Sequence, residues 1–528
     1  MGASSSTEQI SPEQREAESL AASTGALSAL EKAFSTLSDP ETKTIPITSL
    51  KECFKLSIDY PNCEASFKPE SFPALLNHLG PSILDHFFIS DKDGLNWITF
   101  LNSYTNCCGR MPTSNSLNNL LKVFGSAVVK SGATTGMQIE STDADYKING
   151  YLLPADLLML LWMCWVMSWS SRNRQMVKEN AMFGLPDVNN LVLSAVSSCV
   201  EGGAELNVWD DGILGSDRQI PIGKLHAWVL KTAPNLPECL VQFVHSRISN
   251  SASQQDVLEP SSSSSGDSHS IAPSNNYLLT PGRAWSISLT LRSTMRDEML
   301  KTCFAPDAAE VKENLLYRSS LHGKGLSRFW SNVEGYNGPI LVLISATSED
   351  HSWSIGALTH QAFVNKDTFY GTSGSLYAIS PVFNHLTSSG KEKNFVYSHL
   401  HVTGYEAKPK PVGIAFGGSI GNERIFMDED FSKLTVCHHA YDKTYQSGAL
   451  FPNQGYLPTE AHILEVEVWG LGGEKVKEAQ NIFLKRELLF TEQRRKVDLK
   501  TFSNWEDSPE KMMMDMVSNP NAVRREER

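Results

Sequence analysis

Two runs of sequence near the C-terminal end decide the fold, GPILVLI at residues 338–344 and ILEVEVWG at residues 463–470. The first is a short apolar run behind a Gly-Pro pair, which is typical of a strand buried on both faces. The second alternates apolar and charged residues, so it predicts a strand with one face on a core and one in water. Glycines recur between the runs, where strands turn or approach closely. The pattern predicts a two-layer antiparallel β-sandwich with flanking helices, rather than a βαβ succession.

Further motifs surround these strands in a fixed order. They are LLYRSS at 315–320, HGKGLS at 322–327, SIGA at 354–357, FYGT at 369–372 and GIAFGG at 413–418. The order resembles the TLDc domain, a family associated with V-type proton pumps and with oxidative-stress protection. The resemblance implies a domain that binds partners and has no established catalytic site. It marks as candidate partner-binding residues Phe369, Tyr370, Gly371, Phe416, Gly417 and Gly418.

Length and composition place the rest of the chain. At 528 residues it is too long for one core, so we expect two or three domains. Hydrophobic residues make up 41% and charged residues 20%, which is the balance of a soluble globular protein. A formal net charge of −13 argues against general nucleic-acid binding, which needs a basic surface. The nine cysteines show no disulfide spacing and no secretory signal is evident, so we expect a reducing cytosolic environment.

The chain divides into five segments by composition and pattern. The linker contains a serine run at 261–265 and few large apolar residues, so we expect it to be disordered. In the second domain, WSISLTL at 285–291 alternates like a strand. The segments are a flexible N-terminus (1–24), a helical EF-hand-like domain (25–245), a Ser-rich linker (246–276), the TLDc-like domain (277–473) and a helical extension (474–528).

The most hydrophobic run of the chain is LLMLLWMCWVMSW at 157–169. It is shorter than the roughly 20 residues that an α-helix needs to span a bilayer. Pro154 suits the first turn of a helix, and Asp156 is favourable near its N-terminus. The run therefore predicts a buried core helix, and a partner-facing or lipid-facing aromatic helix is the alternative.

The chain begins MGASSS, which matches the N-myristoylation pattern at Gly2. One acyl chain gives only marginal, reversible membrane attachment. The nearby side chains are acidic and no cysteine lies beside Gly2, so neither a basic patch nor palmitoylation reinforces the anchor. Stable residence on a membrane would then require a protein partner.

The sequence DKDGLNWITFLN at 91–102 resembles an EF-hand loop, with Asp91 and Asp93 at its first and third positions. Asn96 stands at the turn position, where it can adopt the left-handed conformation. The fifth position is Leu95, and the twelfth, which should be a bidentate glutamate, is Asn102. We therefore expect no calcium at this degenerate loop and assign it a structural role. A calcium sensor is a remaining alternative, which calorimetric titration with Ca²⁺ would test.

After residue 473 the sequence is charged and has the pattern of a helix, with Val476, Ala479, Ile482 and Phe483 at helical spacing. A methionine cluster, MMMDM, follows at 512–516, and such clusters suit adaptable binding surfaces. Two interpretations stay open. The extension either packs on its own domain or docks into a groove of a partner.

Catalytic candidates are few. Cys437 and His438 are neighbours in a strand and so point to opposite faces, which is poor placement for a nucleophile and its base. His399 and His401 lack a visible third ligand for Zn²⁺, and the glycine-rich run at 413–421 lacks the Lys-Ser/Thr of a phosphate loop. Many TLDc relatives carry a glutamate shortly after FYGT, where this chain has SGS at 373–375. We expect no catalysis, no metal and no cofactor.

The combination of these segments resembles the myristoylated, lysosome-associated TLDc proteins. That resemblance implies a non-enzymatic, peripheral membrane adaptor that binds the V-type ATPase on the cytosolic face of an endolysosomal or vacuolar membrane. It would modulate proton pumping or associated signalling there. The alternative from another class is an oxidative-stress protein that acts through an exposed, reactive cysteine such as Cys437.

Overall fold

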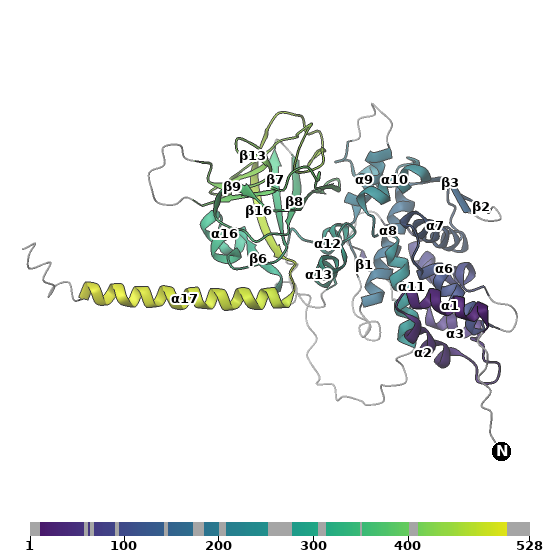
Figure 1. The fold of residues 1–528 in the computed structure, drawn as a ribbon. Coiled ribbons are helices and arrows are strands. Elements are labelled where there is room, and N and C mark those ends of the chain that lie inside the picture. Colours follow the sequence, from purple (N-terminus) through teal and green to yellow (C-terminus); the bar gives the residue numbers. More distant parts are fainter. Residues whose placement is uncertain are drawn as a thin grey trace, which may run out of the picture.

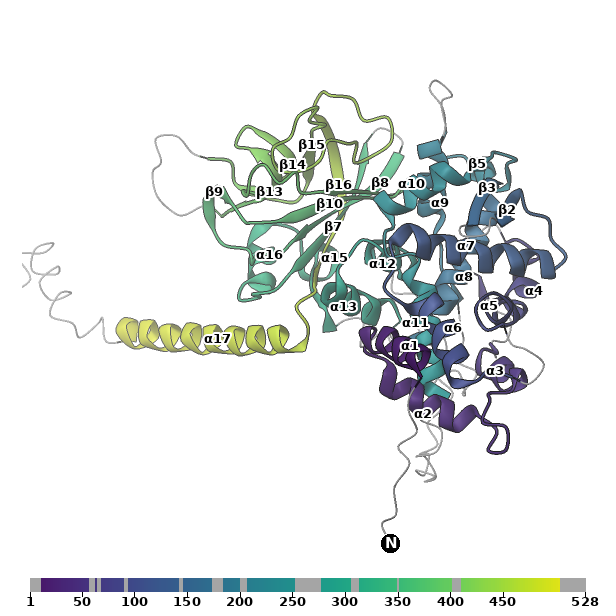
Figure 2. The ribbon, with the colours of Figure 1, turned by 45° about the vertical axis from the view of Figure 1, so that its right-hand side comes forward.

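The computed structural model describes residues 11–56, 62–63, 68–89, 94–141, 146–172, 184–199, 207–251, 277–304, 313–348, 351–400 and 410–503. A helical N-terminal part and a β-rich C-terminal part lie side by side, and the last helix extends away from both (Figure 1, Figure 2). This confirms the predicted α+β class, with helices first and an antiparallel sheet after them. Within the described ranges, no helix combines the length and the hydropathy needed to cross a membrane.

The N-terminal part consists mainly of helices. They are α1 (Pro12–Ser23), α2 (Leu27–Leu37), α3 (Ile47–Cys53), α4 (Phe72–Asn77), α5 (Leu79–Phe87), α6 (Trp97–Cys108), α7 (Thr113–Lys130), α8 (Pro154–Arg172), α9 (Asn189–Cys199), α10 (Ile222–Thr232) and α11 (Glu238–Ser251). The short elements between them are β1 (Asn62–Cys63), β2 (Met137–Ser141), β3 (Tyr146–Leu152), β4 (Gly184–Leu185), η2 (Asp211–Gly215) and β5 (Ile220–Pro221).

Helix α8 forms the centre of this part, and every side chain from 157 to 167 is buried. Its indole groups donate hydrogen bonds to the segment that leads into α9. Trp162 Nε1 lies 3.0 Å from Pro186 O, and Trp165 Nε1 lies 3.2 Å from Gly184 O. The prediction of a buried core helix is confirmed, because an all-round apolar helix is stable only when other elements enclose it.

Two helix–loop–helix units, α2–α3 and α5–α6, are joined through their loops. Ile45 and Leu95 form an isolated antiparallel bridge, with N···O distances of 2.8 and 3.0 Å. The same arrangement recurs further along the chain, where β3 pairs with β5 and Leu152 faces Ile220. In all four units the bridging residue stands just before a helix, α3, α6, α8 or α10.

The loop before α6 differs from the predicted register. Asn96 is extended, with φ −75° and ψ 172°, and its side chain accepts a hydrogen bond from Thr99 N, so it is the N-cap of α6. The left-handed position is instead Gly94, with φ +93°. A Cβ on Gly94 would lie 2.7 Å from Ile45 O, so the bridge requires glycine there.

The C-terminal part begins with two helices, continues as a sheet and ends in a long helix. The helices are α12 (Pro281–Ser288), α13 (Ser293–Cys303), α15 (Ser319–His322), α16 (Leu326–Val333) and α17 (Glu474–Ser503). The strands are β6 (Leu315–Arg318), β7 (Ile340–Ser348), β8 (His351–Thr359), β9 (Lys366–Tyr370), β10 (Gly374–Ser380), β11 (Asn384–Thr387), β12 (Val396–His399), β13 (Gly413–Ser419), β14 (Asn422–Asp428), β15 (Lys433–Val436) and β16 (Thr459–Gly470).

The strand predicted at 285–291 is wrong, because these residues belong to α12 and the turn after it. Thr280 caps the helix, since its Oγ1 accepts a hydrogen bond from Arg283 N at 3.3 Å, and Pro281 follows at the first helical position. The intervening serines do not face water. Ser286 and Ser288 are buried and donate hydrogen bonds to carbonyls of their own helix. The apparent alternation of period two was therefore misleading.

The strands form one continuous antiparallel sheet that curls, rather than the predicted sandwich of two sheets. The order is β11-β10-β8-β7-β16-β15-β14-β13-β12-β9, with β6 on the end of β16. Strand β16 explains the difference. Its beginning pairs with β15, from Thr459 to His462, and its remainder pairs with β7, from His462 to Gly470. One long strand therefore belongs to both halves and closes the curl without a break.

Strand β7 is buried on both faces, as the sequence predicted. Ile340, Val342 and Ile344 point into the core inside the curled sheet. Leu341 and Leu343 point to the outer face, into the same hydrophobic core as helices of the N-terminal part. The two parts are therefore not separately packed bodies, because the helical layer covers one face of the sheet.

Glu467 in β16 was expected to face water and is instead fully buried. Its carboxylate accepts hydrogen bonds from Leu278 N at 2.8 Å, Leu279 N at 3.2 Å and Trp469 Nε1 at 3.0 Å. Arg318 Nε lies 3.5 Å away. This side chain fastens the segment before α12 to the sheet, since buried donors need acceptors.

We expect Glu467→Ala to lower the free energy of unfolding by about 2–4 kcal/mol, because it strands buried backbone and indole donors. Urea unfolding followed by tryptophan fluorescence would measure the change. Glu460→Ala on the same strand is the matched control, since Glu460 makes only a surface ion pair with Lys433. Equal midpoints for the two variants would contradict the fastening role of Glu467.

Candidate functional site

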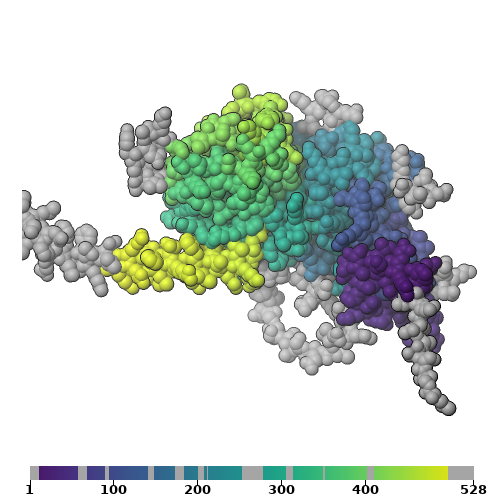
Figure 3. All heavy atoms as spheres, viewed as in Figure 1, coloured from purple at the N-terminus to yellow at the C-terminus, as the bar shows by residue number. Residues whose placement is uncertain are grey.

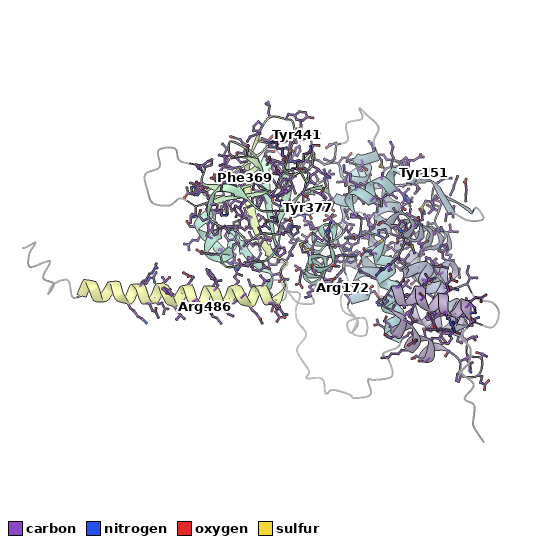
Figure 4. The ribbon with its side chains drawn as sticks, in the orientation of Figure 1. Tyr151, Arg172, Phe369, Tyr377, Tyr441 and Arg486 are labelled. Atoms are coloured by element: carbon purple, nitrogen blue, oxygen red, sulfur yellow. The ribbon has the colours of Figure 1, made fainter. Side chains whose placement is uncertain are left out.

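The candidate partner-binding residues lie at one edge of the curled sheet, on β9, in the turn after it and on β13, with β12 between the two strands. Phe369, labelled in Figure 4, lies on the side of the sheet away from the helical part, 5.4 Å from the ring of Tyr397. The Tyr370 hydroxyl lies 2.7 Å from Ser398 Oγ and accepts a hydrogen bond from Val364 N. The rings of Phe369 and Tyr370 are half-buried, whereas that of Phe416 is fully buried.

The fingerprint glycines shape the backbone. Gly371, Gly417 and Gly418 all have positive φ, of +101°, +69° and +85°. A Cβ on Gly417 would lie 2.8 Å from the ring of Tyr445, and one on Gly418 would lie 2.2 Å from Asn422 O. These positions require glycine for packing, and Gly417 and Gly418 do so where a loop that contains Thr444 and Tyr445 packs on β13.

That loop spans residues 437–458, and a buried ion pair fastens it. Arg424 in β14 and Asp442 are both almost fully buried, with Nη1 and Oδ2 2.9 Å apart. The guanidinium also donates to Gln446 O and Gly448 O, at 2.7 and 2.8 Å. Thr444 donates from its N and its Oγ1 to the other carboxylate oxygen. The guanidinium, with the Asp442 carboxylate and two carbonyl oxygens as acceptors, thus fixes the part of the loop from Asp442 to Gly448.

Burial alone would raise the pKa of the Asp442 carboxyl. Hydrogen bonds from Thr444 and the Arg424 guanidinium outweigh burial and hold that pKa below its ordinary value of 3.8. The carboxylate therefore stabilises the fold fully above about that pH. Its contribution is lost as the pH falls through the lower, folded-state pKa.

The fixed loop presents apolar side chains to solvent. Tyr456 is 71% and Leu457 is 81% exposed, and the ring of Tyr456 stacks on His438. Tyr441, labelled in Figure 4, is also exposed, with Lys391 Nζ 4.4 Å from its ring centre. Tyrosine is enriched where proteins contact one another, so this loop is a candidate surface for a protein partner.

A second candidate surface is α17. Its first turns pack on the sheet domain, because Val476 contacts the core and Gln480 Nε2 donates to Asn332 O and Glu334 O. Figure 3 shows the rest of the helix, in yellow, extending past the sheet domain. We call the part after Phe483 the outer part of α17. Its exposed apolar side chains are Leu488, Leu489 and Phe490, each 59–66% exposed.

Of the two interpretations that the sequence left open, packing on its own domain holds for the beginning of the helix, and docking into a partner stays a prediction. The beginning of the helix packs on its own domain, and the outer part carries apolar side chains that nothing in the described chain covers. The methionine cluster at 512–516 lies outside the described residues.

The catalytic candidates do not assemble. Cys437 was expected to be exposed and is buried, at 9% exposure. Burial, and secondarily Glu423, raises the pKa of its thiol, which disfavours the reactive thiolate. The nearby carboxylate of Asp428, at the end of β14, accepts hydrogen bonds from Ser432 and Lys433 and so stabilises a turn. Over the described ranges, His, Cys, Asp and Glu form no group of three that could hold a metal.

Several predicted site residues cannot be placed. Gly2, Asp91, Asp93 and His401 lie outside the described residues, as does most of the Ser-rich linker. Asn102 is described, but it lies on α6, exposed, and not at the end of a loop. Sequence reasoning missed Arg424 and Glu467. Neither segment gave a clear signal, because NERIFMD and ILEVEVWG each carry more than one charged residue and only packing decides which of them is buried.

A family model for the TLDc domain matches residues 290–472. The match runs from the segment between α12 and α13 to the end of β16, so it includes the whole curled sheet. A comparison with curated proteins gives no match. The predicted resemblance is thereby confirmed for this domain, while the N-terminal helices and α17 lie outside the match.

We expect Asp442→Asn to lower the free energy of unfolding by about 3–5 kcal/mol at pH 7, because it leaves the buried Arg424 without a charge partner. Urea unfolding at pH 7 would measure the loss. The control is Asp367→Asn, which breaks a surface ion pair with Lys410 and should leave the midpoint nearly unchanged. If Asp442→Asn unfolded at the same urea concentration as Asp367→Asn, the ion pair of Arg424 and Asp442 would not be what holds the loop.

Proposed function

Residues 290–472 are a TLDc domain, and from that premise we propose that the chain is a non-enzymatic, peripheral membrane adaptor. In this proposal it binds the V-type ATPase on the cytosolic face of an acidic organelle, endolysosomal or vacuolar, and modulates proton pumping or associated signalling. The partner comes from the family resemblance. The TLDc domain by itself does not identify it, so the proposal needs support from this chain's own surfaces.

The outer part of α17 is the observation that carries the proposal. A helix anchored at one end by Val476 and Gln480 presents Leu488, Leu489 and Phe490 to solvent. These side chains follow one another in sequence and so point to different sides of the helix. A helix that is apolar on more than one side is suited to insertion between two elements of a partner, as in helix-in-groove recognition.

Membrane attachment in this proposal has two contributions. The motif at Gly2 would supply one acyl chain, which alone gives reversible binding. The pump, itself a membrane complex, would supply the second contact through α17 and the loop at 437–458. Two weak contacts on one surface then combine through a high effective concentration.

The paired N-terminal loops support an EF-hand-like module in a structural role. The bridge between Ile45 and Leu95 joins two helix–loop–helix units, which is the arrangement that an EF-hand pair would keep after losing its metal. The ligand positions at Leu95 and Asn102 remain unsuited to calcium. We therefore propose that the helical part is a scaffold for the TLDc domain, and a calcium sensor is the less favoured alternative.

A triple variant, Leu488→Ser with Leu489→Ser and Phe490→Ser, tests the adaptor function. We expect it to recover at least about tenfold less V-type ATPase from solubilised membranes than the unaltered chain, as for the loss of an interface hot spot. Subunits recovered would be quantified by mass spectrometry. The matched control is Leu321→Ser with Leu464→Ser, which removes exposed apolar side chains elsewhere on the C-terminal part.

Gly2→Ala completes the experiment. It should weaken attachment to intact membranes while leaving recovery of the pump from detergent extracts unchanged. If neither the unaltered chain nor any variant recovers pump subunits, the proposed partner is wrong. If the triple variant recovers as much of the pump as the control variant does, the proposed docking helix is wrong.

The redox alternative makes a different prediction at Cys437. Because burial raises the pKa of this thiol, the native chain should react slowly with iodoacetamide at pH 7, and urea should greatly accelerate the reaction. Cys437→Ser should then retain all cellular function. Loss of protection against hydrogen peroxide in that variant, with pump recovery intact, would favour the oxidative-stress reading.

A further inference from the structure

A groove of about 790 Å³ opens on the surface of the helical part, between α5, α6 and α7. It lies outside the TLDc domain and is not used in the proposed function. Lys122, Arg110 and His86 contribute its basic side chains, one from each neighbouring region of the wall. Among the described residues that line it, none is an aspartate or a glutamate.

Lys122 is the most informative of these residues. It is only 6% exposed, although lysine is rarely buried so fully. Burial, and then the nearby Lys122 ammonium, lowers the pKa of His86 to about 4, so that ring is neutral at pH 7. Arg110 is exposed at the rim. The groove thus has a buried ammonium at its wall, a guanidinium at its edge and a neutral imidazole between α5 and α7.

The remaining polar lining is rich in amides. Five asparagines line the groove, Asn102 and Asn106 from α6 and Asn115, Asn118 and Asn119 from α7. Each amide offers two donors and an acceptor. Within the described chain, Asn119 Nδ2 donates to Asn106 O at 3.2 Å, while the side chains of Asn102 and Asn118 make no hydrogen bond.

The basic side chains and the asparagine amides of the groove together indicate a class of ligand. Lysine and arginine bind phosphate through charge-assisted hydrogen bonds, whereas amides that both donate and accept match hydroxyl groups. We propose that the groove binds a phosphorylated polyol, of which inositol phosphates and the headgroups of phosphoinositides are the biological forms. The phosphate would contact Lys122 and Arg110, and the ring hydroxyls would contact Asn102 and its neighbours.

An acidic peptide fits the groove less well. A peptide usually places side chains in apolar pockets along an extended path. Here Phe87, Ile89 and Met111 are the large apolar side chains of a lining that is otherwise mostly polar. The cationic and amide groups gather in one groove instead of following an extended track, which suits a compact ligand.

The test uses the full chain with Gly2→Ala, so that an acyl chain cannot contribute to membrane binding. Calorimetric titration with soluble inositol trisphosphate measures the free ligand, and inorganic phosphate measures the anion alone. Flotation with phosphatidylcholine vesicles, with or without a phosphoinositide, measures the headgroup. No pump is present in these titrations, so an absence of inositol phosphate binding would not contradict the adaptor proposal. In the same way, a failure to recover pump subunits would not contradict ligand binding in the groove.

We expect saturable binding of inositol trisphosphate that Lys122→Met and Arg110→Gln each weaken by about tenfold or more. Arg110 is exposed, so its variant remains informative if Lys122→Met destabilises the fold. Lys130→Gln is the matched control, because Lys130 lies further along α7, outside the groove, and pairs with Asp85. Asn102→Ala should weaken the polyol but not inorganic phosphate.

The two arms assign the source of the ligand. Binding in calorimetry alone indicates a soluble polyol phosphate, and flotation that depends on the same residues indicates a lipid headgroup. The proposal is overturned if no titration gives saturable binding, or if Lys130→Gln weakens it as much as Lys122→Met. Equal affinity for inorganic phosphate or for an acidic peptide would overturn it as well.

Discussion

The structure depends on the burial of the outer face of one sheet. Strand β7 is apolar on both sides, so the curled sheet alone would expose Leu341 and Leu343 to water. Helices of the N-terminal part and α12 and α13 cover that face and complete one core. Covering apolar area contributes about 25 cal/mol per Å², which makes the helical layer a requirement of the TLDc domain and not an independent neighbour. Glu467 also fixes the position of the segment that leads into α12, because its carboxylate accepts hydrogen bonds from two backbone N–H groups of that segment.

The helical part repeats one structural unit, a pair of helices joined by a loop. Four helix–loop–helix units are joined in two pairs by short backbone bridges, at Ile45 with Leu95 and at Leu152 with Ile220. Each bridge satisfies backbone groups that a loop would otherwise expose, and it sets the start of the next helix. These contacts are backbone hydrogen bonds, and burial of the apolar helix α8 adds to the stability of this part.

Separate regions are left for recognition. The buried pair of Arg424 and Asp442 fixes one part of the loop that also carries Tyr456 and Leu457, and the anchored start of α17 fixes the direction of its outer part. Helices α5, α6 and α7, whose side chains line the groove, belong to the helical part and lie away from α17 and the sheet (Figure 2). A protein partner and a small polar ligand would then contact different parts of the chain. Rigid support for each surface matters because binding energy is lost when side chains must be ordered on association.

The sequence by itself determined the local elements whose patterns were unambiguous, such as the strand at 340–344, the buried helix at 157–169 and the TLDc domain with its motif order. Apolar periodicity is a local property, so it can be recognised without knowing which elements are neighbours in the fold.

The tertiary structure alone decided which face of an element meets another element. Glu467 read as a water-facing residue, and WSISLTL at 285–291 read as a strand, because alternation cannot reveal that a helical layer covers the sheet or that buried serines bond their own helix. The Lys122 groove and the pairing of distant loops were likewise decided by packing, since both join residues that are brought together only when the helices assemble.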